Sequence, residues 1–330
     1  MIISKTPFRI SFFGGGTDYP VWYKENRGQV LSTTIDKYCY ITLRYLPPFF
    51  PYKHRIVYSK IETVKNINEI LHPAVRATLN FLKIDKGLEI HHDGDLPART
   101  GMGSSSAFTV GLLNSLYGLK GVMISKDRLA KEAIYIERDV LKESVGSQDQ
   151  VAAAHGGFNK ISFAGNDEIK IEPITLTEAR IKELESHLVL YFTGFSRYAS
   201  EVAKTQIEKT LDRKRELTLM YQMVDTAVNI LNDENKNILE FGKLLNETWQ
   251  LKKSLTDKIS TPEIDDIYQR ALEVGAVGGK LLGAGGGGFL LLFIPPEKQK
   301  KVREEFKNLL EVKFHFEKGG SRIIYYNNEI

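Results

Sequence analysis

The sequence predicts a mixed α/β fold in two domains. Its 330 residues are more than one average domain requires. Runs rich in β-branched and aromatic residues alternate with helix-periodic segments, both before residue 175 and again after residue 260. Between these parts, residues 198–256 are charged, helix-periodic and nearly free of glycine and proline. We therefore place a boundary near 175–185 and predict domains at 1–180 and 181–330.

The first predicted domain begins with a strand. Residues 1–13 combine β-branched and aromatic side chains and end at three glycines, Gly14–Gly16. Similar runs, with turns marked by prolines, predict further strands at 28–34, 38–46, 54–58, 87–92 and 157–163. Helix-start signals and apolar spacing predict helices at 72–83, from the serine-rich loop to about 118, and at 126–142.

The second predicted domain is helical in its first part and mixed at its end. A strand-like run at 187–193 precedes the charged helical segment. Helices are then expected at 262–274 and 296–310, and strands at 278–283, 288–294, 312–317 and 321–326.

Composition and charge exclude several classes of protein. Hydrophobic residues make up 42% and charged residues 26%, as in ordinary soluble globular proteins. A net charge of +4 is too small to indicate nucleic-acid binding and fits an anionic small molecule. The single cysteine, Cys39, allows no internal disulfide, which suits a reducing cytoplasm. Apolar runs are too short for a membrane span, and Lys5 and Arg9 interrupt the first one, so we expect no signal peptide.

One acid lies on the apolar face of a predicted helix. In the helix at 126–142, Glu137 follows Ala133 by four positions and falls in the middle of the apolar stripe. Burying an unpaired charge is costly, so this carboxylate must have a partner.

Three glycine-rich segments have the composition of phosphate-binding loops: 14–16, 101–106 and 283–288. Glycines allow close backbone approach, and a helix start presents unpaired N–H groups that bind anions. The middle segment runs from Pro97 through Gly101 and Gly103 into three serines and a helix. Taken alone, it suits a phosphate site and an ordinary serine-capped helix equally well.

Two common nucleotide motifs are excluded. No lysine follows the glycines, as a P-loop requires. The spacing of Gly283, Gly285 and Gly288 matches the dinucleotide fingerprint, but an apolar strand follows where that fold needs a helix. Two acids also lie close to glycines in the sequence: Asp18 follows the first segment, and Asp149 follows a glycine turn. Considered by itself, Asp149 is more typical of a turn or a helix cap than of a catalytic site.

Together these segments resemble the GHMP family of small-molecule kinases, which includes galactokinase and mevalonate kinase. The three family signatures occur in order at 7–20, 96–113 and 280–293, and the resemblance covers essentially the whole chain. The middle signature, Pro-x-x-x-Gly-Met-Gly-Ser-Ser-Ser-Ala, is the most specific. The resemblance implies a ribosomal-S5-like N-terminal domain and a ferredoxin-like C-terminal domain, with ATP and the acceptor held between them.

The resemblance also assigns roles to residues. In the family, the central loop wraps the ATP phosphates, and a serine and a glutamate hold Mg²⁺. The oxygens of Ser105 and Glu137 suit such a hard cation. Asp149 resembles the catalytic carboxylate, either as a base or as the group that orients the acceptor hydroxyl, and Arg9 resembles its paired arginine. The ATP-binding residues implied are Arg99, Thr100, Gly101, Met102, Gly103, Ser104, Ser105 and Ser106.

The acceptor is expected to be a sugar other than galactose. Galactokinases carry Gly-Glu-His-Thr-Asp-Tyr where this chain has Gly14-Gly-Gly-Thr-Asp-Tyr19, so two residues that would bind sugar hydroxyls are glycines. Asp18 is retained and still suits a pair of hydroxyl groups. The acceptor-binding residues implied are Gly16, Thr17, Asp18, Asp149, Gly194, Arg197, Gly285 and Gly286.

The first signature, the segment Gly-Ser-Gln-Asp-Gln at 146–150 and residues 193–200 are similar to D-glycero-D-manno-heptose 7-phosphate kinases. They are also similar to the kinase part of bifunctional fucose-salvage enzymes. The first resemblance implies ATP-dependent phosphorylation of the anomeric hydroxyl, which gives a 1,7-bisphosphate for nucleotide-heptose synthesis. Arg197 is the first candidate for the far phosphate because a guanidinium binds phosphate bidentately; Lys280 and Arg99 are weaker candidates.

Three alternatives stay open. In the first, the acceptor is an unphosphorylated sugar such as L-fucose. In the second, the chain is a non-catalytic paralogue that senses sugar and ATP. In the third, it is a related ATP-dependent decarboxylase. A pure sensor has no chemical need for Arg9, Ser105, Glu137 and Asp149 together. The expected partners are ATP and a sugar phosphate, without nucleic acid or membrane, and the chain is expected to be a monomer or a homodimer.

Overall fold

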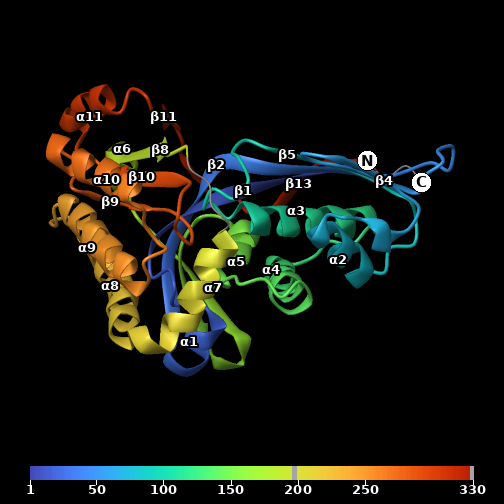
Figure 1. Cartoon of the computed structure of the whole chain (residues 1–330), viewed down its shortest axis with the longest axis horizontal. Helices are drawn as coiled ribbons and strands as arrows, with labels where there is room; N and C mark the ends of the chain where they lie inside the picture. Colours follow the sequence, from blue (N-terminus) through green and yellow to red (C-terminus); the bar gives the residue numbers. More distant parts are fainter. Residues whose placement is uncertain (195–198, 328–330) are drawn as a thin grey trace.

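The computed structural model of the protein describes residues 1–194 and 199–327. Within this part, the chain forms two sheets with helices packed against them (Figure 1). The larger sheet has the order β13-β1-β2-β5-β3-β4, with β6 and β12 also paired to β2, and β7 paired to β6. Its strands are β1 (Ile2–Phe13), β2 (Gly28–Tyr45), β3 (His54–Val57), β4 (Ile61–Val64), β5 (Leu88–Gly94), β6 (Phe158–Ala164), β7 (Glu168–Pro173), β12 (Phe316–Glu317) and β13 (Arg322–Tyr326).

The long strand β2 replaces two predicted strands. In its pairing with β1, Pro7 is opposite Tyr38 and Phe8 is opposite Ile35, so Asp36 and Lys37 bulge out of the ladder. The backbone N–H of Asp36 instead donates to the carbonyl oxygen of His315 at 2.9 Å. The sequence pattern predicts a gap between two strands here, whereas one strand continues through the interruption.

Helices pack against one face of the large sheet (Figure 1). The central helix α3 lies against β1 and β2, and Gly111 permits that approach, because a Cβ there would lie 2.9 Å from the Thr6 hydroxyl. Helix α5 packs on α3, and α4 packs on both. The helices of this part are α1 (Pro20–Asn26), α2 (Pro73–Phe81), α3 (Ser104–Leu119), α4 (Lys126–Ile134) and α5 (Gln148–His155).

The second sheet has ferredoxin-like strand order. Its strands are β8 (Leu188–Phe192), β9 (Gly278–Leu281), β10 (Phe289–Phe293) and β11 (Leu310–Glu311). Its spatial order is β11-β8-β10-β9, and every pairing is antiparallel. Numbered along the chain, this is the order fourth, first, third, second. The ferredoxin-like C-terminal architecture implied by the family resemblance is confirmed.

From Ala199 onward, the charged segment predicted to be helical folds as helices. Helix α9 packs against β9, and α8 packs against α9 and also reaches β1 and β2 of the large sheet. The described helices of this half are α6 (Glu178–His187), α7 (Ala199–Lys209), α8 (Lys214–Asn232), α9 (Leu239–Leu255), α10 (Pro262–Val274) and α11 (Gln299–Glu305). Short 3₁₀ segments occur at Ile67–Glu69, Gly165–Asp167, Thr210–Arg213 and Pro296–Lys298.

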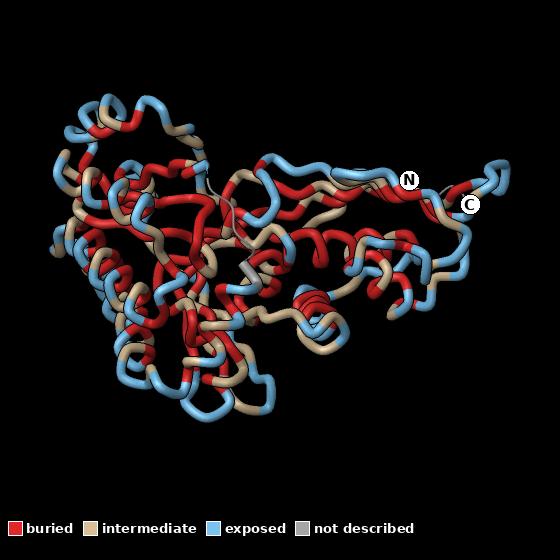
Figure 2. The backbone as a smooth tube through the Cα atoms, in the orientation of Figure 1, coloured by how far each residue is buried: buried red, intermediate tan, exposed pale blue. Residues whose placement is uncertain are grey.

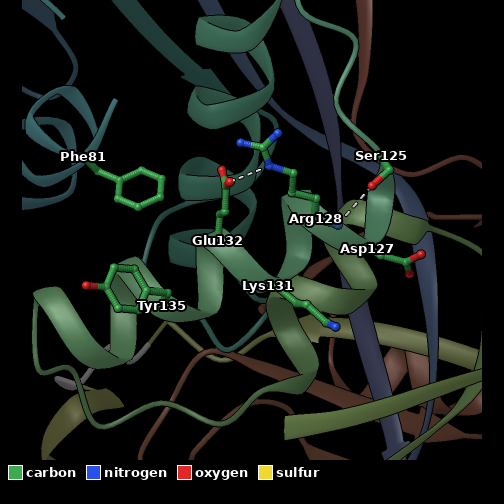
Figure 3. A pocket seen from close by; sticks show the side chains of 7 residues that line it. All are labelled: Phe81, Ser125, Asp127, Arg128, Lys131, Glu132 and Tyr135. Atoms are coloured by element: carbon green, nitrogen blue, oxygen red, sulfur yellow. Dashed lines mark hydrogen bonds and ion pairs between the residues drawn. The ribbon is translucent and has the colours of Figure 1, made fainter. Parts of the chain in front are cut away.

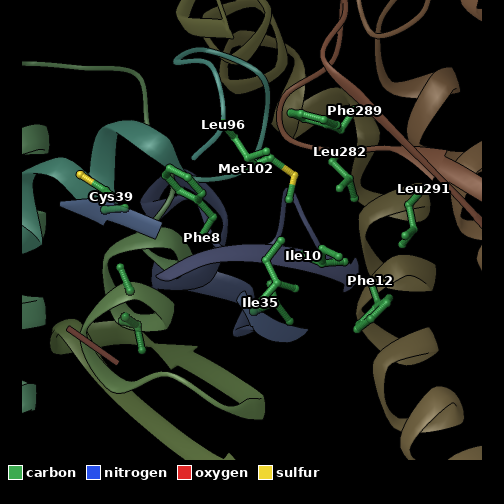
Figure 4. Packing of buried hydrophobic residues seen from close by; sticks show 14 of the residues in the cluster. Phe8, Ile10, Phe12, Ile35, Cys39, Leu96, Met102, Leu282, Phe289 and Leu291 are labelled. Atoms are coloured by element: carbon green, nitrogen blue, oxygen red, sulfur yellow. The ribbon is translucent and has the colours of Figure 1, made fainter. Parts of the chain in front are cut away.

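The two halves share a hydrophobic core where β1 ends. Phe12 and Phe13 of β1 contact Phe241 of α9, with ring centroids 5.6 and 5.0 Å apart, and Phe241 contacts Phe293 of β10. Figure 4 shows side chains of β1 beside Met102 of the serine-rich loop and residues of β10. Figure 2 shows the same distribution along the backbone, with buried residues in the interior of both halves and exposed ones along the outer helices and loops.

Several elements differ from the sequence predictions. Strands β4 and β7 and helices α1, α5 and α6 were not assigned, and the helix expected at 126–142 becomes π-helical at Tyr135–Val140. The last strands, β12 and β13, pair with β2 and β1 of the large sheet. The predicted division at 180/181 falls between β7 and β8. Strands β12 and β13 follow this division in the sequence but belong to the sheet of the first half. No helix in the described ranges is long and apolar enough to cross a membrane.

Candidate active site

An ion pair joins the first strand to the helix α5. The Arg9 side chain lies on β1 with 4% exposure, and its Nε and Nη2 donate to the two carboxylate oxygens of Asp149 at 2.8 and 2.9 Å. Its third nitrogen, Nη1, donates to the carbonyl oxygen of Gly101 at 2.6 Å. The expected contact between Arg9 and Asp149 is therefore present. Because 25% of the Asp149 side chain is exposed, the carboxylate is fixed on one side and accessible on the other.

The serine-rich loop lies directly over this pair. The backbone N–H of Arg9 donates to the carbonyl oxygen of Met102 at 3.1 Å. Gly103 has φ +72°, and a Cβ there would lie 3.3 Å from the Arg9 side chain and 3.4 Å from Asp149 Oδ2. Glycine is needed because this left-handed backbone must pass so close to both side chains. The loop ends at α3, whose first N–H groups have no partner within the helix.

The other predicted loop residues have distinct positions. Thr100 and Met102 are buried, Ser104 is half-buried, and Arg99 and Ser105 are exposed. The Ser104 hydroxyl accepts from the backbone N–H of Arg99 at 3.1 Å, and the Thr100 hydroxyl donates to the carbonyl oxygen of Pro97 at 2.7 Å. These bonds shape the loop. The assignment of these residues to ATP stays a prediction.

Glu137 lies in the π-helical segment and is fully buried. Its Oε2 accepts hydrogen bonds from the Ser106 hydroxyl, at 2.8 Å, and from the Gln150 amide, while Oε1 has no partner among the described residues. Burial raises the pKa of this carboxyl to about 7, although the side chains of Thr109, Ser106 and Gln150 oppose the shift. The partners that the sequence pattern requires for the buried Glu137 carboxylate are thus neutral hydrogen-bond donors and not a cation.

The hydroxyl on Glu137 is Ser106, not Ser105. Successive helical residues point about 100° apart, and Ser105 is exposed where Ser106 is buried. The expected sharing of a metal by Ser105 and Glu137 therefore stays a prediction, with Ser106 as an additional candidate. No group of three or more His, Cys, Asp or Glu side chains in the described part could hold a metal ion, so a cation at Glu137 would need hydroxyl, water or phosphate oxygens as well. That donor set is typical of Mg²⁺ bound with phosphates.

Asp18 lies buried in the turn after β1. Its Oδ1 accepts from the backbone N–H of Gly16 at 2.9 Å, and a Cβ at Gly146 would lie 1.9 Å from its Oδ2. Burial raises the pKa of Asp18, and the charge of Asp149 raises it further. The Thr17 hydroxyl bonds to carbonyl oxygens of Gly14 and Gln29 at 2.8 and 2.9 Å, so it shapes the turn. The acceptor contacts expected of Gly16, Thr17 and Asp18 stay predictions.

Two buried lysines complete the charge distribution. Lys252 of α9 and Lys280 of β9 are 4% and 2% exposed, and their ammonium groups donate to the carbonyl oxygens of Gly283 and Phe12 respectively, the second at 2.8 Å. Burial and the charge of Arg9 lower the pKa of Lys252 to about 8, while the charges of Asp18 and Asp149 oppose that shift. Burial and then the charge of Lys252 lower the pKa of Lys280.

Sequence reasoning missed Lys252 and treated Lys280 only as a weak phosphate candidate. Lys280 carried a signal like that of Glu137, since it is a charged residue in a short apolar strand. Lys252 carried none, because it lies among many lysines on a charged helix.

The third glycine segment packs against the second. A Cβ at Gly283 would lie 2.4 Å from Gly101 Cα, and one at Gly288 would lie 2.2 Å from the Thr100 carbonyl oxygen. Gly285 and Gly286 are buried against Ile259, and the backbone N–H of Gly286 donates to the Ile259 carbonyl oxygen at 2.9 Å. The three glycine segments thus converge on one site.

Two other predicted acceptor residues, Gly194 and Arg197, fall at the undescribed segment 195–198. Gly194 is exposed, and a Cβ there would meet no described residue within 4 Å. Arg197 lies outside the described residues. Their acceptor contacts stay predictions.

A surface groove along α4 is separate from this site. Figure 3 shows its lining side chains, in which Arg128 pairs with Glu132 at 2.8 Å and the Ser125 hydroxyl caps the helix. None of the groove's lining residues belongs to the cluster around Arg9 and Asp149.

The chain matches a known family in both halves. The family descriptions "GHMP kinases N terminal domain" and "GHMP kinases C terminal" match residues 64–157 and 226–312. The chain is 30% identical over 302 residues to D-glycero-alpha-D-manno-heptose 7-phosphate kinase of Campylobacter jejuni, a match that covers 86% of each protein. The chain belongs to the GHMP kinases. It is therefore a phosphotransferase, and ATP is its phosphoryl donor.

Two further similarities place this GHMP kinase among its relatives. It is 25% identical to the bifunctional fucokinase/GDP-fucose pyrophosphorylase of Arabidopsis thaliana, over 84% of this chain and 28% of that protein. A solved structure of a D-glycero-D-manno-heptose 1-phosphate kinase from Bacteroides thetaiotaomicron is similar with a TM-score of 0.74 at 24% identity. That match covers 98% of this chain and 99% of the other. The predicted two-domain GHMP kinase fold is confirmed.

Proposed function

We propose that this GHMP kinase transfers the γ-phosphoryl group of ATP to the anomeric hydroxyl of D-glycero-D-manno-heptose 7-phosphate, forming the 1,7-bisphosphate. The observation that carries the proposal is the Asp149 carboxylate, held by Arg9 beside the serine-rich loop and open on its other side. The name of the relative at 30% identity supports the choice of acceptor.

Asp149 receives the acceptor hydroxyl. Both of its oxygens already bond to Arg9, so the hydroxyl approaches from the exposed side. As the hydroxyl oxygen forms its bond to the γ-phosphorus, the bond to the bridging oxygen of ADP breaks and the hydroxyl proton passes to the carboxylate. The guanidinium of Arg9 stays protonated and offsets negative charge on the transferred group.

The start of α3 holds the ATP phosphates. Its unpaired N–H groups point out of the helix toward the loop, and the partial positive charge of the helix end adds to them. Gly101 and Gly103 have φ +83° and +72°, a left-handed backbone that glycine adopts without strain, and so they allow the loop to turn into the start of α3.

Glu137 with the hydroxyls of Ser105 or Ser106 would hold Mg²⁺. The unpartnered, buried Oε1 of Glu137 fits a cation, since an ionised carboxylate at that depth needs positive charge beside it. When bound, Mg²⁺ supplies charge that neutralises the phosphate oxygens.

Positive charge around the acceptor side supports a phosphorylated substrate. Arg9, Lys252 and Lys280 are buried, and Asp18 and Asp149 are the acids near the lysines within the described residues. Each lysine ammonium has one hydrogen-bond partner among the described residues, which leaves further N–H donors for phosphoryl oxygens. Arg197 stays the candidate for the 7-phosphate itself.

Phosphorylation of an unphosphorylated sugar such as L-fucose is the second candidate. The match to the fucokinase-containing protein favours it. An ADP-release assay over sugars with and without a phosphate group separates the two candidates. We expect the highest kcat/KM with heptose 7-phosphate, and activity confined to unphosphorylated sugars would overturn this choice of acceptor.

A further inference from the structure

Three buried polar atoms beside the Gly14–Asp18 turn lack hydrogen-bond partners among the residues that the structure describes. They are Ser11 Oγ, Gln148 Oε1 and Gln206 Nε2, in residues that are only 5%, 8% and 4% exposed. Buried polar groups are nearly always paired, and each one left unpaired is costly. Three such atoms around one turn therefore indicate a ligand that pairs with them.

The three side chains come from different elements and converge on two adjacent glycines. A Cβ at Gly15 would lie 3.8 Å from Ser11 Oγ and 3.8 Å from Gln148 Nε2, and one at Gly16 would lie 2.6 Å from Gln206 Nε2. Ser11 follows Arg9 by two positions on β1, and Gln148 directly precedes Asp149 on α5. The unpaired atoms thus border the ion pair of the active site.

Their hydrogen-bonding types select the ligand. The Gln206 nitrogen donates, the Gln148 oxygen accepts, and the Ser11 hydroxyl does both. A phosphate or carboxylate only accepts and would leave Gln148 Oε1 unpaired, whereas a hydroxyl both donates and accepts. Two neighbouring hydroxyls on a sugar satisfy the whole set.

We propose that Ser11, Gln148 and Gln206 form a subsite for the hydroxyl groups of the acceptor, and that Gln206 sets the preference among sugars. The proposal rests on the proposed function only in that the acceptor is a sugar; it does not depend on which sugar. Lys252 and Lys280 are also electrostatic neighbours of Asp18, and their ammonium groups suit anionic oxygens, so this subsite for neutral hydroxyls lies near groups that suit a phosphate.

Gly15 forms the floor of the subsite. Its φ lies outside the left-handed region, and the nearest atoms to an added Cβ would be in ordinary van der Waals contact at 3.8 Å. Alanine therefore fits this position in the folded protein. Its methyl group would occupy space between Ser11 and Gln148 that the acceptor requires.

The test compares Gln206→Leu and Gly15→Ala with Gln222→Leu, a control at an exposed glutamine of α8. We expect both subsite variants to raise KM about tenfold or more for every sugar that the wild type phosphorylates, while KM for ATP stays near the wild-type value. The melting temperature of ligand-free Gln206→Leu should be unchanged or higher, because the variant removes an unpaired buried donor. A merely structural glutamine would instead lower it.

Deoxy analogues of the best acceptor identify the bound hydroxyl. If Gln206 binds one hydroxyl, then for the analogue that lacks this hydroxyl the acceptor KM should be the same in Gln206→Leu as in the wild type. An unchanged acceptor KM in both variants, or equal increases for acceptor and ATP, would overturn the subsite. If the wild type phosphorylates only sugars other than heptose 7-phosphate, the proposed function fails, but the same comparison still decides the role of Gln206.

Discussion

Glu137 and Asp149 are acids of one site, twelve positions apart in the sequence, yet their surroundings are opposite. Asp149 is partly exposed and paired with a guanidinium. Glu137 is fully buried, accepts hydrogen bonds from neutral groups, and has one oxygen, Oε1, without a partner among the described residues. The first environment fixes the carboxylate by hydrogen bonds on one side and leaves its other side accessible. In the second environment, burial disfavours the charged form of Glu137 and raises its pKa to about 7.

Removal of Asp149 should have the largest effect. Asp149→Ala should lower kcat by about 10²–10⁴-fold, the usual range for a group that accepts a proton during the reaction. ATP affinity, measured by nucleotide titration, should change little because the loop and α3 are intact. Asp127→Ala is the matched control, since Asp127 also lies in the first turn of a helix and is 78% exposed. Near-wild-type turnover in Asp149→Ala would remove Asp149 from the mechanism.

Glu137→Gln should change the pH dependence of stability. Because the folded-state pKa is raised from 4.5 to about 7, wild-type stability should fall as pH rises through this range. The variant lacks that dependence and should gain about 3 kcal/mol relative to wild type between pH 4 and pH 8. Urea unfolding in metal-free buffer measures both proteins.

Magnesium provides the control for this prediction. Mg²⁺ added with nucleotide at pH 8 should stabilise the wild type more than Glu137→Gln. Parallel stability curves for the two proteins would contradict the buried-acid interpretation.

Arg9→Lys keeps the charge but loses the parallel hydrogen bonds to Asp149. A hydrogen bond to a charged group contributes about 1.5–3 kcal/mol, so kcat should fall roughly 10–150-fold. Arg303→Lys is the matched control, because Arg303 makes the same two-pronged contact to Glu311 on the surface, at 2.8 and 3.0 Å. Equal kcat values for the two variants would show that the two-pronged contact at Arg9 has no catalytic role.

Lys252→Met should have the smallest effect. Since the pKa of Lys252 is lowered to about 8, its charge is lost as pH rises through that value. If the charge assists transfer, kcat/KM of the wild type should decline above pH 8 by about fivefold, corresponding to an interaction on the order of 1 kcal/mol. The variant should show no such decline, whereas Lys253→Met, at the neighbouring half-buried lysine that pairs with Asp265, should keep it. Identical alkaline limbs in all three proteins would contradict this role.

Most residues at the predicted ATP-binding part of the site could be identified from the sequence. Signature spacing and glycine chemistry brought Arg9, Gly101–Ser106 and Asp149 together, and the structure has them in contact. Glu137 was found because a carboxylate on an apolar stripe is locally anomalous. Local patterns are sufficient for these residues, because backbone conformation and helical spacing are encoded within a few positions.

The acceptor side was less predictable. Gln206 and Lys252 lie on charged helices, and they become buried only because α7 lies against the turn at Gly16 and α9 packs against β9 and β1. The choice between Ser105 and Ser106 depends on the rotation of α3. The return of β12 and β13 to the first sheet is likewise a long-range pairing, which no local pattern specifies.

Phosphorus NMR of the product tests the central claim most directly. With ATP and heptose 7-phosphate, the account predicts a product with two phosphoryl groups, one on the anomeric carbon and one retained at position 7, formed in equal amount with ADP. A phosphoryl group transferred to any other carbon, or ADP formed without phosphorylated sugar, would contradict the account.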